Sequence, residues 1–251
     1  EVSLPGDKSL GHRALLLGTL AEGRLAVRNL SDGKDVASPR SCLEALGGRF
    51  SAGPDESVIV AGLGLHGLSA PKGPLDCGNS GTTMRMLMGA LCGQTFPTVL
   101  MGDASLSKRP MRRVAEPLRA MGAKIELSPE GTAPVRISPA KLKGMAHRLS
   151  VPSAQVKSSL LLAGLYADGD TSVDDPFATR DHTERMLQFL SAGKAVAFEG
   201  TNVLLKTKRL SAGTAKSLTL AGDPSSAAFF AAAAALVPGS SVKLLRVLLN
   251  P

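Results

Sequence analysis

Four segments of this chain place hydroxyl groups at the predicted beginning of a helix, and the first three of them also contain cations. The segments start at Lys8, Asn79, Ser153 and Ser225. In the first of them, Ser9 lies between the cations Lys8 and Arg13. The free N–H groups of a helix N-terminus attract anions, and a hydroxyl and two cations beside them make a site for a phosphate or a carboxylate. An ordinary capped helix would explain Asp7 and Ser9 but not the two cations.

The second and third segments repeat this chemistry with different side chains. Gly78 and Gly81 let the backbone approach a ligand closely, and Arg85 follows one turn later. In the third segment, Gln155 can both donate to and accept from a hydroxylated ligand. Lys8, which lies among several other cations, is the candidate for proton transfer.

Two further basic motifs stand just ahead of predicted helices. Arg109 precedes Pro110, which we expect in the first turn of a helix. Arg180 precedes Asp181, the predicted N-cap of another helix. A cation at such a place opposes the helix dipole, so a bound anion is one reason for it to be there. The alternative for both motifs is a solvated basic face.

The bulk composition favours a small anionic ligand over nucleic acid or a membrane. The net charge is +8, but only 3% of the 251 residues are aromatic, with one Tyr and no Trp. Surfaces that bind nucleic acid usually interleave aromatic side chains with the cations. The longest apolar run, 227–237, is too short to span a bilayer, and the chain starts without a secretory signal.

The cysteines and histidines predict neither a metal site nor a disulfide. Cys42, Cys77 and Cys92 are odd in number and show no CxxC spacing, and His66 and His147 stand alone. We therefore expect no zinc and no cofactor, and a reducing cytoplasm is the predicted location.

The four segments stand about 70 residues apart, which predicts one supersecondary unit used several times. Each apolar first helix leads into a short strand and then into a second helix, predicted at 35–46, 110–121 and 181–190. Two strands follow each time, at 48–51 with 58–60, at 124–127 with 135–137, and at 195–198 with 203–205. A further strand is expected ahead of each first helix. This alternation predicts a layered α/β fold in which the first helices are buried on several sides.

The fourth copy is incomplete. It contains a predicted helix at 225–236 and a predicted strand at 242–249, and its second helix and closing strands are missing. We therefore expect three complete units and a stub, as in a fragment or one half of a larger protein. The apolar helix at 227–236 would lack its repeat partners and would promote self-association.

Six motifs in this sequence resemble the 5-enolpyruvylshikimate-3-phosphate synthase (EPSP synthase) family, in family order. They lie at residues 4–9, 78–82, 108–111, 153–158, 179–184 and 222–226. They extend over nearly the whole chain, which is similar to the N-terminal portion of the family. The motifs at 153–158 and 179–183 look most like the bacterial branch that includes glyphosate-tolerant members.

The resemblance implies the enolpyruvyl transferase fold, an inside-out α/β barrel. In that fold two similar domains each contain three βαβαββ units, and the substrates bind between the domains. Residues 7–221 would form the complete three-unit, substrate-binding domain. Residues 1–6 and 222–251 would be parts of a second domain that is truncated here.

The resemblance also implies a reaction. The family transfers the enolpyruvyl group of phosphoenolpyruvate to the 5-hydroxyl of shikimate 3-phosphate, on the route to chorismate and the aromatic amino acids, without a metal. Lys8 would be catalytic. The residues that would bind shikimate 3-phosphate are Lys8, Ser9, Arg13, Ser153, Ala154, Gln155 and Arg180. Those that would bind phosphoenolpyruvate are Lys8, Asn79, Gly81, Arg109 and Gln155, with Arg85 supporting the loop.

This sequence departs from the family in two respects. The acid/base carboxylates of the family lie in the second domain, and no paired carboxylates stand beside the cationic motifs here. We therefore expect the chain to be inactive alone and to need a complementing C-terminal fragment. Gly81 stands where tolerant relatives tend to carry Ala, so we expect glyphosate to inhibit the complemented enzyme.

Two other functions are compatible with the motifs. One is a non-catalytic module that binds a sugar-phosphate-like anion. The other is the related UDP-N-acetylglucosamine enolpyruvyl transferase, whose family expects a reactive Cys near Lys108. No Cys follows Cys92 in this sequence, which disfavours the second alternative.

Overall fold

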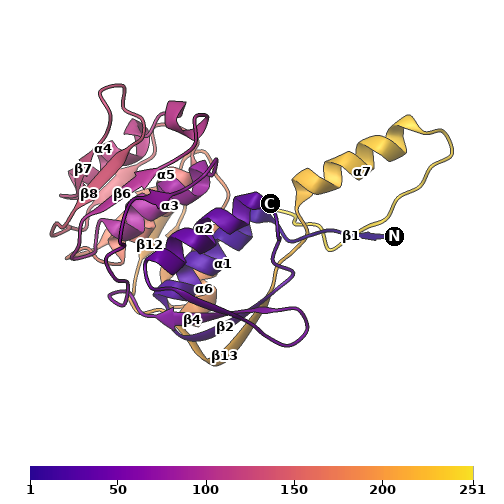
Figure 1. The fold of residues 1–251 in the computed structure, drawn as a ribbon, viewed down its shortest axis with the longest axis horizontal. Coiled ribbons are helices and arrows are strands. Elements are labelled where there is room, and N and C mark those ends of the chain that lie inside the picture. The colour runs from indigo at the N-terminus through magenta and orange to yellow at the C-terminus, as the bar shows by residue number, and fades with distance from the viewer. Residues whose placement is uncertain (251) are drawn as a thin grey trace.

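The computed structural model describes residues 1–250, apart from the side chains of residues 34, 35, 214 and 215. Its main body is built from three units, each with a four-stranded sheet and two helices, and a single helix extends away from this body (Figure 1). Among the described residues, no helix is long and apolar enough to cross a membrane.

The three units have the same order of elements. The first contains α1 (Lys8–Leu20), β2 (Glu22–Arg28), α2 (Lys34–Ala45), β3 (Arg49–Ala52) and β4 (Val58–Leu63). The second contains β5 (Leu75–Asp76), α3 (Gly81–Leu91), β6 (Thr98–Met101), α4 (Arg112–Ala120), β7 (Lys124–Glu126) and β8 (Val135–Ser138), with a 3-10 turn at Leu106–Lys108. The third contains β9 (Ala146–Arg148), α5 (Ala154–Gly164), β10 (Thr171–Asp174), α6 (His182–Leu190), β11 (Val196–Glu199) and β12 (Asn202–Leu205). The predicted repeat is therefore confirmed.

The strand orders show that a strand from the end of the third unit completes the sheet of the first unit. The strand orders are β5-β6-β8-β7, β9-β10-β12-β11 and β13-β2-β4-β3, with the first two strands of each sheet parallel and the others antiparallel. The leading strand of the first sheet is β13 (Ser211–Thr219), which comes from the far end of the third unit. The strand expected ahead of each first helix thus exists, but the first unit takes it from a distant part of the chain. Without β13, the edge of β2 would be unpaired.

The first helices α1, α3 and α5 form the centre of the body. Every residue of α1 from Gly11 to Leu20 is buried, and α3 and α5 are buried over nearly their whole length. The strands carry exposed residues on one face, as in the alternation of β8. A buried Leu contributes about 1.5–3 kcal/mol of transfer free energy, so the leucines of α1 alone account for a large share of the stabilisation. The expected burial of these helices is confirmed.

The remaining elements are β1 (Val2–Ser3), α7 (Pro224–Leu236) and β14 (Leu244–Leu245), with β1 and β14 paired in parallel. Helix α7 matches the prediction, with Asp223 as its N-cap and Pro224 in its first turn. The strand predicted at 242–249 is wrong in extent, because only two of its residues find a partner strand. The start predicted for α4 is also wrong: Arg109 is extended and the helix begins at Arg112, so Pro110 lies outside it.

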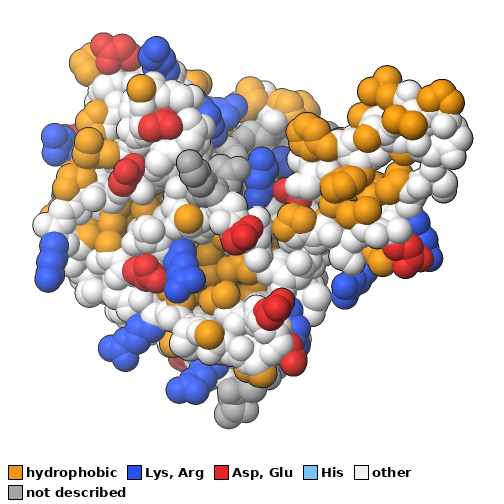
Figure 2. Space-filling model, turned by 45° about the vertical axis from the view of Figure 1, so that its right-hand side comes forward, with side chains coloured by type: hydrophobic (Ala, Val, Ile, Leu, Met, Phe, Trp, Pro, Cys, Tyr) orange, Lys and Arg blue, Asp and Glu red, His pale blue; other side chains and the backbone are white. Residues whose placement is uncertain are grey.

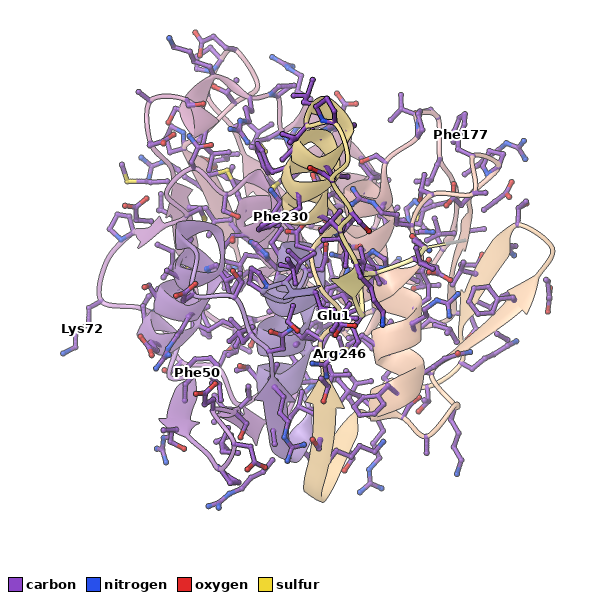
Figure 3. The ribbon with its side chains drawn as sticks, turned by 90° about the vertical axis from the view of Figure 1, so that its right-hand side faces the viewer. Glu1, Phe50, Lys72, Phe177, Phe230 and Arg246 are labelled. Atoms are coloured by element: carbon purple, nitrogen blue, oxygen red, sulfur yellow. The ribbon has the colours of Figure 1, made fainter. Side chains whose placement is uncertain are left out.

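Helix α7 leaves most of its surface uncovered. The exposed fractions of Phe229 and Leu236 are 79% and 81%, and of its residues only Ala227 is buried. Figure 2 shows hydrophobic side chains gathered along this helix. In Figure 3, Phe230 lies on α7, and Glu1 and Arg246 lie near its base.

Candidate functional site

The candidate site is built from the beginnings of α1, α3 and α5. Each helix starts at one of the motifs found in the sequence, and a side chain caps each start. The Asp7 carboxylate accepts a hydrogen bond from the Leu10 N–H at 2.8 Å. Ser80 Oγ accepts from the Thr83 N–H at 3.2 Å, and Ser153 Oγ from the Val156 N–H at 3.4 Å. Asp7, and not Ser9, is therefore the cap of α1.

Side-chain hydrogen bonds hold these three helix beginnings together. His12 Nε2 lies 2.9 Å from Ser80 Oγ and joins α1 to α3. Arg85 Nη1 donates to Gln155 Oε1 at 2.7 Å and joins α3 to α5. Because both links lie within the first turns of the helices, the three N-termini open toward the same region.

Four of the side chains predicted to bind phosphoenolpyruvate or to support its loop form two hydrogen-bonded pairs. Arg109 Nη2 donates to Asn79 Oδ1 at 2.5 Å, and Arg85 bonds Gln155 as described above. A Cβ added at Gly81 would lie 3.0 Å from Arg85 Nη1 and 3.4 Å from Arg109 Nη1. Two guanidinium groups therefore converge on the first residue of α3.

The positive charge of this cluster is concentrated. Burial, together with the charges of Arg113 and Arg109, lowers the pKa of Arg85 to about 10. Arg85 nevertheless remains a cation at neutral pH, and its buried Nε has no hydrogen-bond partner among the described residues. Three cations at a helix N-terminus repel one another and the helix dipole. An anion bound between them would relieve this repulsion.

Arg13 is an internal support of the site. Its side chain is only 2% exposed. Its guanidinium donates to Thr183 Oγ1 at 2.7 Å, to the Ser9 carbonyl at 2.9 Å and to Ser158 Oγ at 2.9 Å. Burial lowers the pKa of Arg13 to about 10. Arg13 thus ties α1 to α5 and α6 and holds the backbone at Ser9.

Arg180 brings a second cation to the beginning of α1. Its side chain is exposed. Burial raises the pKa of the neighbouring Asp7, and the positive charge of Arg180 reduces this rise. Burial, followed by the charges of Arg13 and Arg180, lowers the pKa of His182 to about 4. His182 is therefore neutral at pH 7, and its surroundings are electropositive. Asp181 is the N-cap of α6, as predicted, although its side chain makes no capping hydrogen bond.

The carboxylates of Asp7 and Asp223, which cap α1 and α7, lie near each other, a proximity that the sequence analysis did not predict. The Asp7 N–H donates to the Ala221 carbonyl at 2.8 Å, and the Asp223 N–H donates to the Pro5 carbonyl at 2.9 Å. The two crossing segments bring both side chains close. Burial, with a contribution from the charge of Asp223, raises the pKa of Asp7. The pair was missed because its members lie at opposite ends of the chain.

Lys157 has a different role from the one expected of a cation in a ligand-binding motif. Its Nζ lies 2.8 Å from Asp175 Oδ2, 2.7 Å from Glu184 Oε1 and 3.1 Å from the Thr179 carbonyl. All three side chains of this buried charge cluster, which we define as Lys157, Asp175 and Glu184, are at most 4% exposed. The cluster holds the turn that carries Arg180.

Within the described part of the chain, no three His, Cys, Asp or Glu side chains form a group that could hold a metal ion. Cys42, Cys77 and Cys92 are buried and free. The chemistry of the candidate site therefore has to be derived from its cations, hydroxyls, amides and helix N-termini.

Comparisons with known proteins agree with the motifs. The family model described as EPSP synthase (3-phosphoshikimate 1-carboxyvinyltransferase) matches residues 1–251. The 3-phosphoshikimate 1-carboxyvinyltransferase of Methylococcus capsulatus is 49% identical over 253 residues, which cover 100% of this chain and 57% of the relative. The protein of the same name from Acidithiobacillus ferrooxidans is 50% identical, with 99% of this chain and 56% of the relative covered.

A solved structure shows the same similarity in three dimensions. EPSP synthase from Acinetobacter baumannii aligns with a TM-score of 0.89 and 44% identity, covering 100% of this chain and 56% of that chain. The described fold, with three βαβαββ units and the start of a further unit, is thus shared with these proteins. The chain spans little more than half the length of the relatives it matches.

Proposed function

Because the chain belongs to the EPSP synthase family, we propose that it supplies the N-terminal half of an enzyme that transfers the enolpyruvyl group of phosphoenolpyruvate to shikimate 3-phosphate. The observation that carries this proposal is the convergence of Arg85 and Arg109 on Gly81, at the first turn of α3. Both substrates are polyanions, and they repel each other. Fixed cations that are already in place lower the cost of bringing them together.

Phosphoenolpyruvate would bind at the beginning of α3. Its anionic groups would accept from Arg109 and Lys8 beside Gly81. Asn79 holds Arg109, and Arg85 holds Gln155, so these contacts orient the donors before the ligand arrives. Gln155 Nε2 also donates to Thr82 Oγ1 at 2.8 Å, which fixes the amide in one orientation.

Shikimate 3-phosphate would bind beside it, at the beginnings of α1 and α5. Its phosphate would be held by Ser153, the Ala154 N–H and Arg180, and its ring hydroxyls by Gln155. Ser9 and Lys8 would complete the site from α1. Arg13 is almost fully buried, so its part would be to fix Ser9 and α5, with at most one edge of its guanidinium turned toward the ligand.

The reaction forms a bond between the 5-hydroxyl oxygen and C2 of phosphoenolpyruvate, and the C2–O bond to phosphate then breaks. The hydroxyl loses its proton, and C3 gains and later loses one. Lys8 is the group of this chain that would move a proton, since its side chain is exposed at the start of α1. The carboxylates for the other proton transfers would come from the remainder of the protein. We therefore propose that this chain needs a complementing C-terminal half for turnover.

The exposed face of α7 supports the need for this second half. A helix with this much uncovered apolar surface, including Phe229 and Leu236, normally packs against further structure. The three free cysteines are consistent with a cytoplasmic location, which is part of the proposal.

The proposal is tested by titrating the 251-residue chain calorimetrically with shikimate 3-phosphate and then with phosphoenolpyruvate, with and without the missing half. We expect weak binding by the chain alone, and tight ternary binding with phosphate release by the pair. Arg109→Gln should weaken phosphoenolpyruvate binding by about 1.5–3 kcal/mol, or roughly ten- to a hundredfold.

The control is Arg112→Gln, which removes the same charge nearby from a side chain that bonds the Pro129 carbonyl instead. This variant should change phosphoenolpyruvate affinity by less than about twofold, since an exposed cation outside the cluster contributes little. Binding of both anions without any phosphate release by the reconstituted pair would favour a non-catalytic anion-binding module instead.

A further inference from the structure

His12 connects the first turn of α1 with the cap of α3. It lies one turn after Lys8 and is only 3% exposed. Its Nδ1 lies 2.6 Å from the Lys8 carbonyl oxygen, and its Nε2 lies 2.9 Å from Ser80 Oγ. Ser80 immediately precedes Gly81, so one imidazole ring spans two of the motifs that the sequence singled out.

The hydrogen bonds around the ring determine its tautomer. The Lys8 carbonyl can only accept, so Nδ1 must carry a proton. Ser80 Oγ already accepts from the Thr83 N–H at 3.2 Å and from the Thr83 hydroxyl at 2.8 Å. Both lone pairs of Ser80 Oγ are then used, and its own proton is left for Nε2. His12 is therefore the neutral Nδ1–H form, in which one nitrogen donates and the other accepts.

This arrangement fixes the rotamer of Ser80. A serine cap without an acceptor for its own proton can rotate between several partners, whereas here the hydroxyl is held on three sides. The ring borders a small cavity, whose other lining residues are Leu16, Pro39, Leu43, Thr83, Met86 and Leu87. The cap, and with it the turn at Gly81, is thereby held at a defined place relative to Lys8.

We propose that His12 is a positioning residue that fixes the Ser80–Gly81 turn of α3 against the first turn of α1. In the proposed enzyme, which is the premise for this second step, the turn carries Gly81, where Arg85 and Arg109 converge and phosphoenolpyruvate would bind, while Lys8 approaches from α1. His12 itself touches neither substrate. It sets the separation between two groups that must act on the same ligand, and small errors in such a separation are costly for binding and turnover.

The test compares His12→Asn with two other variants in the 251-residue chain. An Asn amide can still donate to the Lys8 carbonyl but cannot reach Ser80, so it removes only the link to α3. Leu43→Val is the matched control, because Leu43 lines the same cavity and makes no hydrogen bond through its side chain. Ser80→Ala removes the partner, and the double variant His12→Asn/Ser80→Ala completes a cycle.

The first measurement is amide hydrogen exchange, which does not depend on any ligand. We expect exchange at Gly81 and Thr83 to rise by roughly tenfold in His12→Asn, relative to its global unfolding, and to stay unchanged in Leu43→Val. In the double variant, His12→Asn should add little to the effect of Ser80→Ala. Unchanged exchange at both amides, or fully additive effects in the cycle, would overturn the proposal.

The second measurement is phosphoenolpyruvate binding in the presence of shikimate 3-phosphate, by the chain paired with the missing half. His12→Asn should weaken phosphoenolpyruvate binding by roughly tenfold and shikimate 3-phosphate binding by less than about twofold. An equal loss for both ligands would indicate a merely structural role and contradict the inference. If the unaltered pair binds no phosphoenolpyruvate, the proposed function fails, and the exchange measurement still decides whether His12 fixes the turn.

Discussion

The buried charge cluster of Lys157, Asp175 and Glu184 gives the sharpest prediction for stability. Lys157 donates hydrogen bonds to Asp175 and to the Thr179 carbonyl, and it forms an ion pair with Glu184. The variant Lys157→Met keeps much of the volume and removes the charge. Two carboxylates that are at most 4% exposed then lose the cation that pairs with both of them, while the charge of Arg13 still acts on Glu184. Breaking a buried ion pair in this way costs about 3–5 kcal/mol, out of a typical total of about 5–15 kcal/mol.

The loss of stability should depend on which residue of the buried charge cluster is replaced. In Glu184→Gln, Lys157 keeps Asp175 and no unpaired charge remains, so we expect a smaller loss of about 1–2 kcal/mol. Adding Glu184→Gln to Lys157→Met should recover part of the stability, because one of the two stranded carboxylates disappears. Lys124→Met, at an exposed position of β7, is the control and should change stability by less than about 0.5 kcal/mol.

The cost of Lys157→Met should also depend on pH. Burial raises the pKa of Glu184, while the charge of Lys157 lowers it in part, so removing Lys157 raises this pKa further. A carboxyl group whose pKa is higher in the folded state binds more protons there, and the free energy of unfolding falls as pH rises through that window. The deficit of Lys157→Met should therefore be largest near neutral pH and shrink as the pH is lowered through the raised pKa of Glu184, which lies above the ordinary range of a carboxyl group.

Urea unfolding of the chain at pH 7.5 and at pH 5 measures both effects. Near neutral pH we expect the variant to lose about 3–5 kcal/mol, and less at the lower pH. The pKa of Asp175 is lowered by Lys157 in the unaltered chain, so the stabilisation from that carboxylate also disappears on acidification. This loss also makes the difference in stability between the unaltered chain and Lys157→Met smaller at low pH. A loss below 1 kcal/mol, or an equal loss at the two pH values, would refute the reasoning.

Three further predictions concern the site and the exposed helix. Gly81→Ala should raise the KM for phosphoenolpyruvate and weaken inhibition by glyphosate in the reconstituted enzyme, since the new Cβ would lie 3.0 Å from Arg85 Nη1; unchanged inhibition would contradict the geometry. Asp223→Asn should lower the pKa of Asp7, because one of the charges that raise it is removed, and a carboxyl titration by NMR that shows no downward shift would count against the pair. Phe229→Ser should reduce self-association of the isolated chain, measured by sedimentation velocity, and equal association of both proteins would show that α7 is not the contact.

The sequence predicted the local elements well, because their signals are local. Hydroxyl groups ahead of an apolar stretch place the beginnings of α3 and α5 within a residue or two of their observed starts. The start of α4 was the exception. Arg109 adopts an extended conformation, in which its side chain reaches Asn79, and the preceding 3-10 turn shifts the helix start to Arg112. A tertiary contact has here overridden the preference of Pro110 for a first turn.

Contacts between segments that are distant in the chain could not be predicted from the sequence. Nothing in residues 211–219 indicates that they lead the first sheet, since β13 and β2 pair only after the whole body has assembled. The carboxylate pair of Asp7 and Asp223 depends on the same closure. Lys157 was grouped with the ligand-binding cations, because spacing alone does not show that Asp175 and Glu184 surround it.

The repeat explains why the candidate site lies where it does. Three similar units place three similar helices at the centre of the body, and each helix contributes its positive end to one region. A single helix N-terminus is a weak anion site, but three of them, joined through His12, Arg85 and Arg13, add their dipoles to fixed cations. Such an arrangement is unfavourable without a ligand, because like charges are held together at a cost in stability. The charges of Arg109 and Arg113 disfavour the cation of Arg85 in the empty site, and the proposed binding of anions would offset this repulsion.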